Sequence, residues 1–300
     1  MANIFGDESA DERAERVFAV AAIMGTDKQW EEFVPAWVDI TEGQEFHAAE
    51  WEALVAHDKE LLDKRQKSYR KLTELIAWSG MHGWGVAVDL VSYRKAFPHI
   101  TSDHAYHKCF IEVVERLIKD AIGLCHRDLK LTFDCRQGSG TTGRLYDWIS
   151  SLPQWEGSLL FADKISFANR KNPRIQAADL LARETMKGLY DKIGPSPRSM
   201  RKSLITLASS ARHFQFRFLM DDYFEQMREG LARDIERCKN EYDGWLRKMG
   251  AQDNLDNRHR FMIWQDAQAL RGERRTQERR IPEIRQRNGA DHERSSQQDK

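Results

Sequence analysis

Three aspartates occupy positions from which carboxylates could hold a divalent cation. Asp7 follows the short apolar stretch that begins at Asn3, and Asp134 follows the alternating stretch 129–133. We expect each to end a β-strand, which places its side chain at the rim of a sheet. Asp179 lies in the first turns of a helix that Pro173 opens. Carboxylates at neighbouring strand ends can share a cation such as Mg²⁺, which prefers hard oxygen ligands.

The chemistry that such a site performs is metal-dependent phosphoryl transfer. Two cations about 4 Å apart activate a water and stabilise the leaving oxygen of a phosphodiester. Without metal, carboxylates that close together repel and raise one another's pKa. The alternative is that Asp7, Asp134 and Asp179 are unrelated surface acids, because aspartate is also a common turn former at strand ends.

Further polar residues near these aspartates have two interpretations each. Glu8 points away from Asp7 if the strand continues, because neighbours alternate faces, and joins the site only if the chain turns there. His47, at a strand–helix junction, is either a general acid or base, a phosphate contact, or a hydrogen-bonded structural histidine. Gln176 shares a helix face with Asp179 and either orients a ligand oxygen or caps the strand edge. Basic side chains that either contact a phosphate backbone or keep the surface soluble are Arg170, Lys171, Arg174, Arg198, Arg201 and Lys202.

The elements that must position these residues follow from hydrophobic periodicity. Strands are predicted at 3–7, 16–25, 83–91, 129–135 and 158–167, and the principal helices at 58–79, 102–125 and from 173 onward. The first two strands form a hairpin, and later strands alternate with helices. This order favours an α/β fold, a mixed sheet flanked by helices.

The C-terminal third is predicted to be helical. Gly194-Pro195-Ser196-Pro197 marks the best candidate boundary, and helices are expected at 200–207, 221–249 and 258–270. Beyond residue 271 the chain is rich in Arg, Glu and Gln and has almost no apolar residues, so it cannot bury enough surface to fold alone. We therefore expect a domain at 1–195, a helical extension at 196–271, and a charged, disordered tail at 272–300.

The amino-acid composition restricts the classes of function that this protein can have. The 300 residues carry 47 Lys and Arg against 47 Asp and Glu, so nucleic-acid contact must come from local basic patches. The four cysteines form no CxxC pair, which favours a reducing compartment. The N-terminus lacks the pattern of a signal peptide, and the longest apolar run is too short for a membrane span. A soluble, cytoplasmic protein is expected.

Four segments together resemble a known family. They are Phe5-Gly6-Asp7-Glu8-Ser9, Phe46-His47-Ala48-Ala49-Glu50, the strand ending in Asp134, and Ile175-Gln176-Ala177-Ala178-Asp179-Leu180-Leu181-Ala182. Their order over residues 1–195 resembles the bacterial and phage proteins grouped as domain of unknown function 3800. The chain departs from that pattern at Ala10, where glycine is common, and in the loosely matched segment 169–172.

The resemblance implies a ribonuclease H-like fold with an acidic metal site for Mg²⁺ or Mn²⁺. Its members would be Asp7, Asp134 and Asp179, with Glu8, His47 or Glu50 as further candidates. We therefore expect a metal-dependent nuclease acting on nucleic acid, or a hydrolase of a small phosphoester with the same acids. The alternative is a non-catalytic module of a phage-defence or mobile-element system that binds a protein partner through residues 220–300.

Overall fold

The computed structural model describes residues 1–53, 59–98, 102–134, 139–151, 155, 157, 160–161, 163–210, 213–254, 257–258 and 260–261. The first part of the chain forms β1 (Ala2–Ala10), β2 (Val17–Thr26), α1 (Asp27–Thr41), α2 (Ala48–Glu52), α3 (Lys59–Ala77), β3 (His82–Asp89), α4 (Leu90–Ala96) and α5 (Ser102–Gly123). There follow β4 (Leu129–Asp134), α6 (Ser139–Ser150), β5 (Ser166–Ala168), α7 (Pro173–Ile193), α8 (Lys202–Ser209), β6 (Phe214–Leu219) and α9 (Asp221–Met249).

Within the described residues, six strands form one mixed sheet in the order β5-β4-β1-β2-β3-β6. Among them only β2 runs opposite to the others: it is antiparallel to β1 and β3, whereas β1 and β4, β4 and β5, and β3 and β6 are parallel pairs. Three consecutive antiparallel strands, β1, β2 and β3, with β4 and β5 added in parallel beside β1, form the ribonuclease H-like arrangement. The predicted fold class, a mixed α/β sheet flanked by helices and followed by a C-terminal helix, is confirmed.

Local sequence explains where the principal elements begin. β2 is almost entirely apolar and buried, as expected for a central strand. It ends at Thr26, which opens α1 with a capping box to Gln29. Asn172 caps α7 by accepting a hydrogen bond from the Arg174 amide, and Pro173 occupies the first turn.

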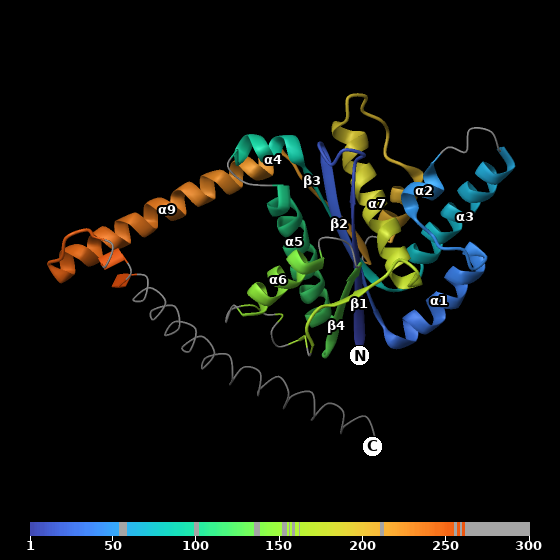
Figure 1. Ribbon diagram of the computed structural model, residues 1–300, viewed down its shortest axis with the longest axis horizontal. Helices are drawn as coiled ribbons and strands as arrows, with labels where there is room; N and C mark the ends of the chain where they lie inside the picture. The colour runs from blue at the N-terminus through green and yellow to red at the C-terminus, as the bar shows by residue number, and fades with distance from the viewer. Residues whose placement is uncertain are drawn as a thin grey trace, which may run out of the picture. The chain divides into compact units, whose positions relative to one another are not determined.

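Helices cover both faces of the sheet (Figure 1). On one face α7 contacts β1, β2 and β3, and α1, α2, α3 and α8 pack around it. The core there is rich in aromatics and aliphatics, among them Phe5, Trp30, Trp37 and Phe46. On the other face α5 contacts β2 and β3, and its Phe110 ring lies 5.1 Å from the ring of Phe133 on β4.

One prediction about the C-terminal third is wrong. The sequence predicts only helices after Pro197, but β6 pairs in parallel with β3 and extends the sheet. Residues 214, 216 and 218 are all phenylalanine, an alternation typical of a strand that the prediction overlooked. The domain boundary expected near residue 195 is therefore too early, because α8 and β6 belong to the same compact unit as the rest of the sheet.

The chain divides into two compact units, Met1–Gln226 and Met227–Lys300. In the second unit Tyr242 and Trp245 contact the ring of Phe261, and Arg258 pairs with Asp253. The expected charged tail at 272–300 lies outside the described residues, as does most of the helix predicted at 258–270. No described helix has the length and apolar content that a membrane span requires.

Candidate active site

The sheet register brings two of the predicted acids to neighbouring positions. The parallel pairing of β1 with β4 runs up to Gly6 opposite Phe133, so Asp7 and Asp134 are the next residue on each strand. Both side chains are buried, at 0% and 5% exposure. Residues side by side on parallel strands project to the same face of the sheet. The two carboxylates therefore lie on one face, one strand spacing apart.

The face they occupy is the one that α7 covers. Phe133 packs on α5, so the residue after it, Asp134, projects to the opposite side. Phe5 lies two residues before Asp7 and shares its face; its ring is 5.1 Å from that of Trp30 and 5.3 Å from the Arg174 guanidinium of α7. Both observations place Asp7 and Asp134 on the face of the sheet that α7 covers.

Asp179 approaches the same face from above. It is 6% exposed, and its Oδ2 accepts a hydrogen bond of 2.8 Å from the backbone N–H of Ala48, the first residue of α2. On α7 it lies between Arg174, which contacts Phe5, and Met186, which packs with Ala19, the strand partner of Ser9. This interval of α7 lies over the part of β1 that carries Asp7.

The convergence of the three aspartates on one cation remains a prediction. Among the described residues, no group of three or more His, Cys, Asp or Glu side chains is positioned to hold a metal ion. The structure thus provides an adjacent pair, Asp7 and Asp134, with Asp179 tethered to α2 above the same face. It does not provide a preformed three-carboxylate centre in the part of the chain that it describes.

Glu8 lies on the other side of the sheet. β1 continues to Ala10 instead of ending at Asp7, so the turn that would bring Glu8 beside Asp7 does not occur. Glu8 shares its face with α5, where Tyr106 lies. Burial raises the pKa of Tyr106, and the negative charges of Glu8 and Asp7 raise it further. The expectation that Glu8 joins Asp7 as a metal ligand is corrected by this alternation.

His47 and Glu50 lie where α2 begins. His47 is the residue before the helix, and the amide of the next residue, Ala48, holds Asp179. The His47 Nδ1 atom is 3.9 Å from the Glu50 carboxylate; the His47 side chain is 18% exposed and that of Glu50 is 74% exposed. His47 therefore flanks the tether of Asp179, whereas Glu50 projects into solvent.

Gln176 has a structural role in this arrangement. Its Oε1 accepts a hydrogen bond of 2.8 Å from the Trp37 indole N–H, and its Nε2 donates one of 2.8 Å to the Arg170 carbonyl. Both ends of the amide are therefore used to join α1 to the start of α7. Of the two interpretations from sequence, the structural one agrees with these contacts.

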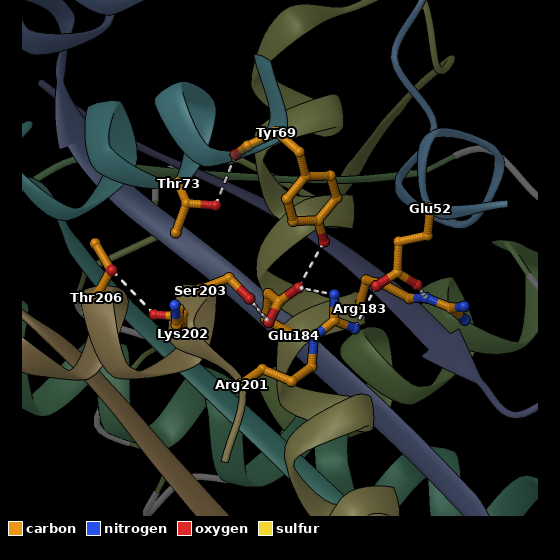
Figure 2. A network of polar contacts seen from close by, with 9 residues as sticks. All are labelled: Glu52, Tyr69, Thr73, Arg183, Glu184, Arg201, Lys202, Ser203 and Thr206. Carbon is orange, nitrogen blue, oxygen red and sulfur yellow. Dashed lines mark hydrogen bonds and ion pairs between the residues drawn. The ribbon is translucent and has the colours of Figure 1, made fainter. Parts of the chain in front are cut away.

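A buried polar network centred on Glu184 of α7 is not predicted by the sequence (Figure 2). Glu184 is fully buried; its carboxylate accepts hydrogen bonds from the Tyr69 hydroxyl at 2.6 Å and the Ser203 hydroxyl at 2.5 Å, and the Arg201 guanidinium lies 3.3 Å away. Burial raises the pKa of Glu184, against the opposing effects of Arg201, Ser203 and Tyr69. Nothing in the spacing of these residues links α3, α7 and α8, so only the fold reveals the network.

Glu52, at the end of α2, extends this network. It accepts a hydrogen bond of 2.8 Å from Arg183 and forms an ion pair with Arg201. Arg201 therefore lies between two carboxylates, Glu52 and Glu184. The sequence leaves Arg201 as either a phosphate contact or a charge that keeps the surface soluble. Its ion pairs with two acids limit the first of these roles.

The strand order and the acidic pair together define an α/β protein of ribonuclease H-like topology with buried carboxylates on adjacent strands. No protein-family model matches the chain, and neither does any curated protein. A chain in the solved structure of the PCNA:RNase HII complex from Archaeoglobus fulgidus is similar, at 13% sequence identity and a TM-score of 0.36, covering 70% of this chain and 87% of that chain. At so low a score, the fold class is based on the strand order and register given above.

Proposed function

We propose that this protein hydrolyses phosphodiester bonds of nucleic acid with the aid of a divalent cation. The observation that carries the proposal is the adjacent placement of Asp7 and Asp134, two buried carboxylates that share one face of neighbouring parallel strands. Asp179 is the third proposed ligand, because its tether to Ala48 holds it over the same face. The proposed cation is Mg²⁺ or Mn²⁺.

The donor set is compatible with such a cation. A divalent cation placed between two neighbouring buried carboxylates supplies positive charge that attracts both of them. Mg²⁺ is commonly bound by only one or two carboxylates, together with water and substrate phosphate. The cation supplies water activation and charge stabilisation at the leaving oxygen.

We assign roles to three neighbouring residues, Ala48, His47 and Glu50, without treating them as metal ligands. The Ala48 amide fixes the orientation of Asp179 by occupying one of its oxygens. His47 lies next to that amide, where a general acid or base or a phosphate contact is useful. Glu50, exposed one turn into α2, is proposed only as an accessory to His47, with which it forms an ion pair when the imidazole is protonated.

The test is cleavage of single-stranded and double-stranded DNA, RNA and hybrid substrates with Mn²⁺, with Mg²⁺ and with EDTA. We expect cation-dependent cleavage by the wild type. Asp7→Asn and Asp134→Asn should each reduce it about 100-fold or more, because each removes a charged ligand. Asp63→Asn, at an exposed position on α3, is the matched control and should retain wild-type activity.

Glu8→Gln gives a second, sharper comparison on the same strand. Since Glu8 faces α5, we expect its activity to stay within a few-fold of the wild type, whereas Asp7→Asn one residue away abolishes cleavage. Equal cleavage by the wild type and Asp7→Asn, or cleavage that persists in EDTA, would contradict the proposal. If the protein cleaves only a small phosphoester, the proposed acidic site stands and the proposed substrate changes from nucleic acid to a small phosphoester.

A second candidate function is a non-catalytic interaction module. The observation in its favour is α9, on which Leu231 and Ile235 are one helical turn apart and both exposed. An apolar stripe of this kind fits a helix of a protein partner. Calorimetry that detects no Mn²⁺ binding, with partner capture that requires residues 220–300, would favour this function over hydrolysis.

A further inference from the structure

A pocket of about 880 Å³ lies between α3, α7 and α8, within the first unit. Its volume is within the range of sites for small ligands, about 300–1,000 Å³. Five cationic and three acidic side chains line it, so its lining is net basic although the chain as a whole is neutral. These are Arg70, Lys187, Arg198, Arg201 and Lys202, against Glu52, Glu74 and Asp191.

Part of this charge is already compensated. Arg201 lies between Glu52 and Glu184, and the Arg70 guanidinium is 3.7 Å from the Glu74 carboxylate. Lys187, Arg198 and Lys202 form no ion pair with any described residue. The pocket therefore presents three cations whose charge an incoming anion would neutralise.

The buried network gives this pocket a fixed wall (Figure 2). Glu184 accepts hydrogen bonds from Tyr69 on α3 and Ser203 on α8, so it joins the two helices that flank the pocket to α7. Arg201 is held against it from the residue that precedes α8. A binding wall whose side chains are locked by such contacts loses little conformational entropy when a ligand arrives.

Lys187 lies in an environment that favours the approach of an anion. It is half-buried on α7, and burial lowers its pKa, with Arg183 and Arg201 lowering it further. Glu52 and Asp191 act in the opposite direction without reversing the shift. An anion in the pocket would stabilise the ammonium form that this cluster of positive charge now disfavours.

A second basic pocket adjoins the first. It measures about 800 Å³ and is lined by Arg13, Arg16, Arg94 and Arg183, along with Asp11, Glu12 and Glu15. Lys187 lines both pockets. The second pocket lies at the turn that follows β1, the strand of Asp7. A ligand with more than one phosphate could therefore occupy both.

We propose that the pocket between α3, α7 and α8 binds a phosphate group carried by a nucleotide or by a nucleic-acid strand, with Lys187, Arg198 and Lys202 as its cationic contacts. The shared chemistry is a phosphate ester that takes charge-assisted hydrogen bonds from lysine and arginine. This inference concerns binding alone and does not require the hydrolysis proposed above.

The test measures binding of an oligonucleotide to the protein in the presence of EDTA, which removes any contribution from a divalent cation. The probes are a short fluorescein-labelled single-stranded oligonucleotide, followed by anisotropy, and adenosine monophosphate and inorganic phosphate as competitors. The variants are Lys187→Gln and Lys202→Gln. Lys192→Gln is the matched control, since it removes an exposed charge from the last turn of α7 outside the pocket lining. Circular dichroism melts confirm that each variant folds.

We expect Lys187→Gln and Lys202→Gln each to weaken oligonucleotide binding about fivefold to tenfold and to reduce its salt slope by about one. Lys192→Gln should stay within about twofold. Displacement by adenosine monophosphate would identify a nucleotide as the source, and displacement only by unlabelled oligonucleotide would identify a strand; both support the pocket. Absence of binding by the wild type, or equal affinities of all three variants and the wild type, would overturn it.

Discussion

At the scale of single residues, this protein keeps several carboxylates out of water. Asp7 and Asp134 are buried beside each other on the sheet, and Glu184 is buried among hydroxyls and a guanidinium. A buried carboxylate is retained only where a cation or several donors compensate for lost hydration. Glu184 receives hydrogen bonds from Tyr69 and Ser203. The Oδ1 atom of Asp7 accepts one from the Glu8 backbone amide at 2.8 Å, and we propose that a bound cation contacts Asp7 and Asp134 in addition.

Glu184 makes the stability of the protein depend on pH. Because its pKa in the folded state is raised above the ordinary glutamate value of 4.5, the folded state binds the Glu184 proton more tightly than the unfolded state does. The resulting stabilisation is fully present below pH 4.5 and is lost as the pH rises through the raised pKa. As the pH rises through this pKa, we expect the unfolding free energy of the wild type to fall relative to that of Glu184→Gln.

Urea unfolding of both proteins between about pH 4 and pH 7 measures this difference. Glutamine keeps the size of the side chain and can still accept hydrogen bonds from Tyr69 and Ser203, and Glu52 still pairs with Arg201. A difference in unfolding free energy between the two proteins that is constant, or that grows in favour of the wild type as pH rises, would contradict the assignment of the shift to burial.

At the scale of elements, the glycines of β3 leave room for side chains of α7 to pack against the strand. A Cβ at Gly85 would overlap the Thr185 side chain, with the Thr185 Cβ atom only 3.0 Å away. We expect Gly85→Ala to destabilise the fold by about 1–3 kcal/mol through overpacking. It should also reduce cleavage, because displacing α7 moves Asp179.

Thermal and urea unfolding measure the first effect, and the matched control is Gly230→Ala. A Cβ at Gly230 meets no atom within 4 Å, and Gly230 lies in α9, so alanine there should leave stability unchanged or raise it slightly. If Gly85→Ala is as stable as the wild type, α7 can shift freely and does not hold Asp179 at a fixed height over β1.

The elements also show what hydrophobic patterns can and cannot predict. The long apolar run of β2 and the glycine-flanked β3 were predicted within a residue or two of their observed bounds. β6 was missed because its Phe-Gln-Phe-Arg-Phe pattern is short and follows a helix in a region dominated by helical periodicity. The sequence predicts that β1 ends at Asp7, because an aspartate after an apolar stretch is typical of a strand end. The structure differs, since backbone pairing with β2 continues to Ala10.

The sequence indicates members of the proposed site, but it indicates only part of their arrangement. Asp7 and Asp134 could be recognised from their place after apolar strands, but their adjacency depends on β1 pairing in parallel with β4, a contact between segments over a hundred residues apart. Periodicity carries no information about such pairing. The Glu184 network could not be predicted for the same reason, because its partners Tyr69 and Ser203 lie on other helices of the chain, α3 and α8.

At the scale of the whole molecule, the first unit should be independently stable and should require α8 and β6. We expect residues 1–226 to fold cooperatively and residues 1–195 not to do so. The shorter fragment exposes the β3 edge, loses the apolar side chains of Leu204, Leu207 and Phe214, each worth about 1.5–3 kcal/mol of burial, and leaves Glu184 without Arg201 and Ser203.

Circular dichroism melts of the two fragments test this boundary. A single sharp transition for 1–226 and a broad or absent one for 1–195 is the expected result. A fragment 1–195 that is as stable and cooperative as 1–226 would show that α8 and β6 are appended to a complete domain, as the sequence alone indicated.

The central claim is that Asp7 and Asp134 bind one divalent cation between adjacent strands. The most direct measurement is diffraction from Mn²⁺-soaked crystals at the manganese absorption edge. The account predicts an anomalous peak at coordination distance, about 2 Å, from carboxylate oxygens of both Asp7 and Asp134 in the wild type, and its loss in Asp7→Asn. No peak at this position, or a peak that survives in Asp7→Asn, would contradict it.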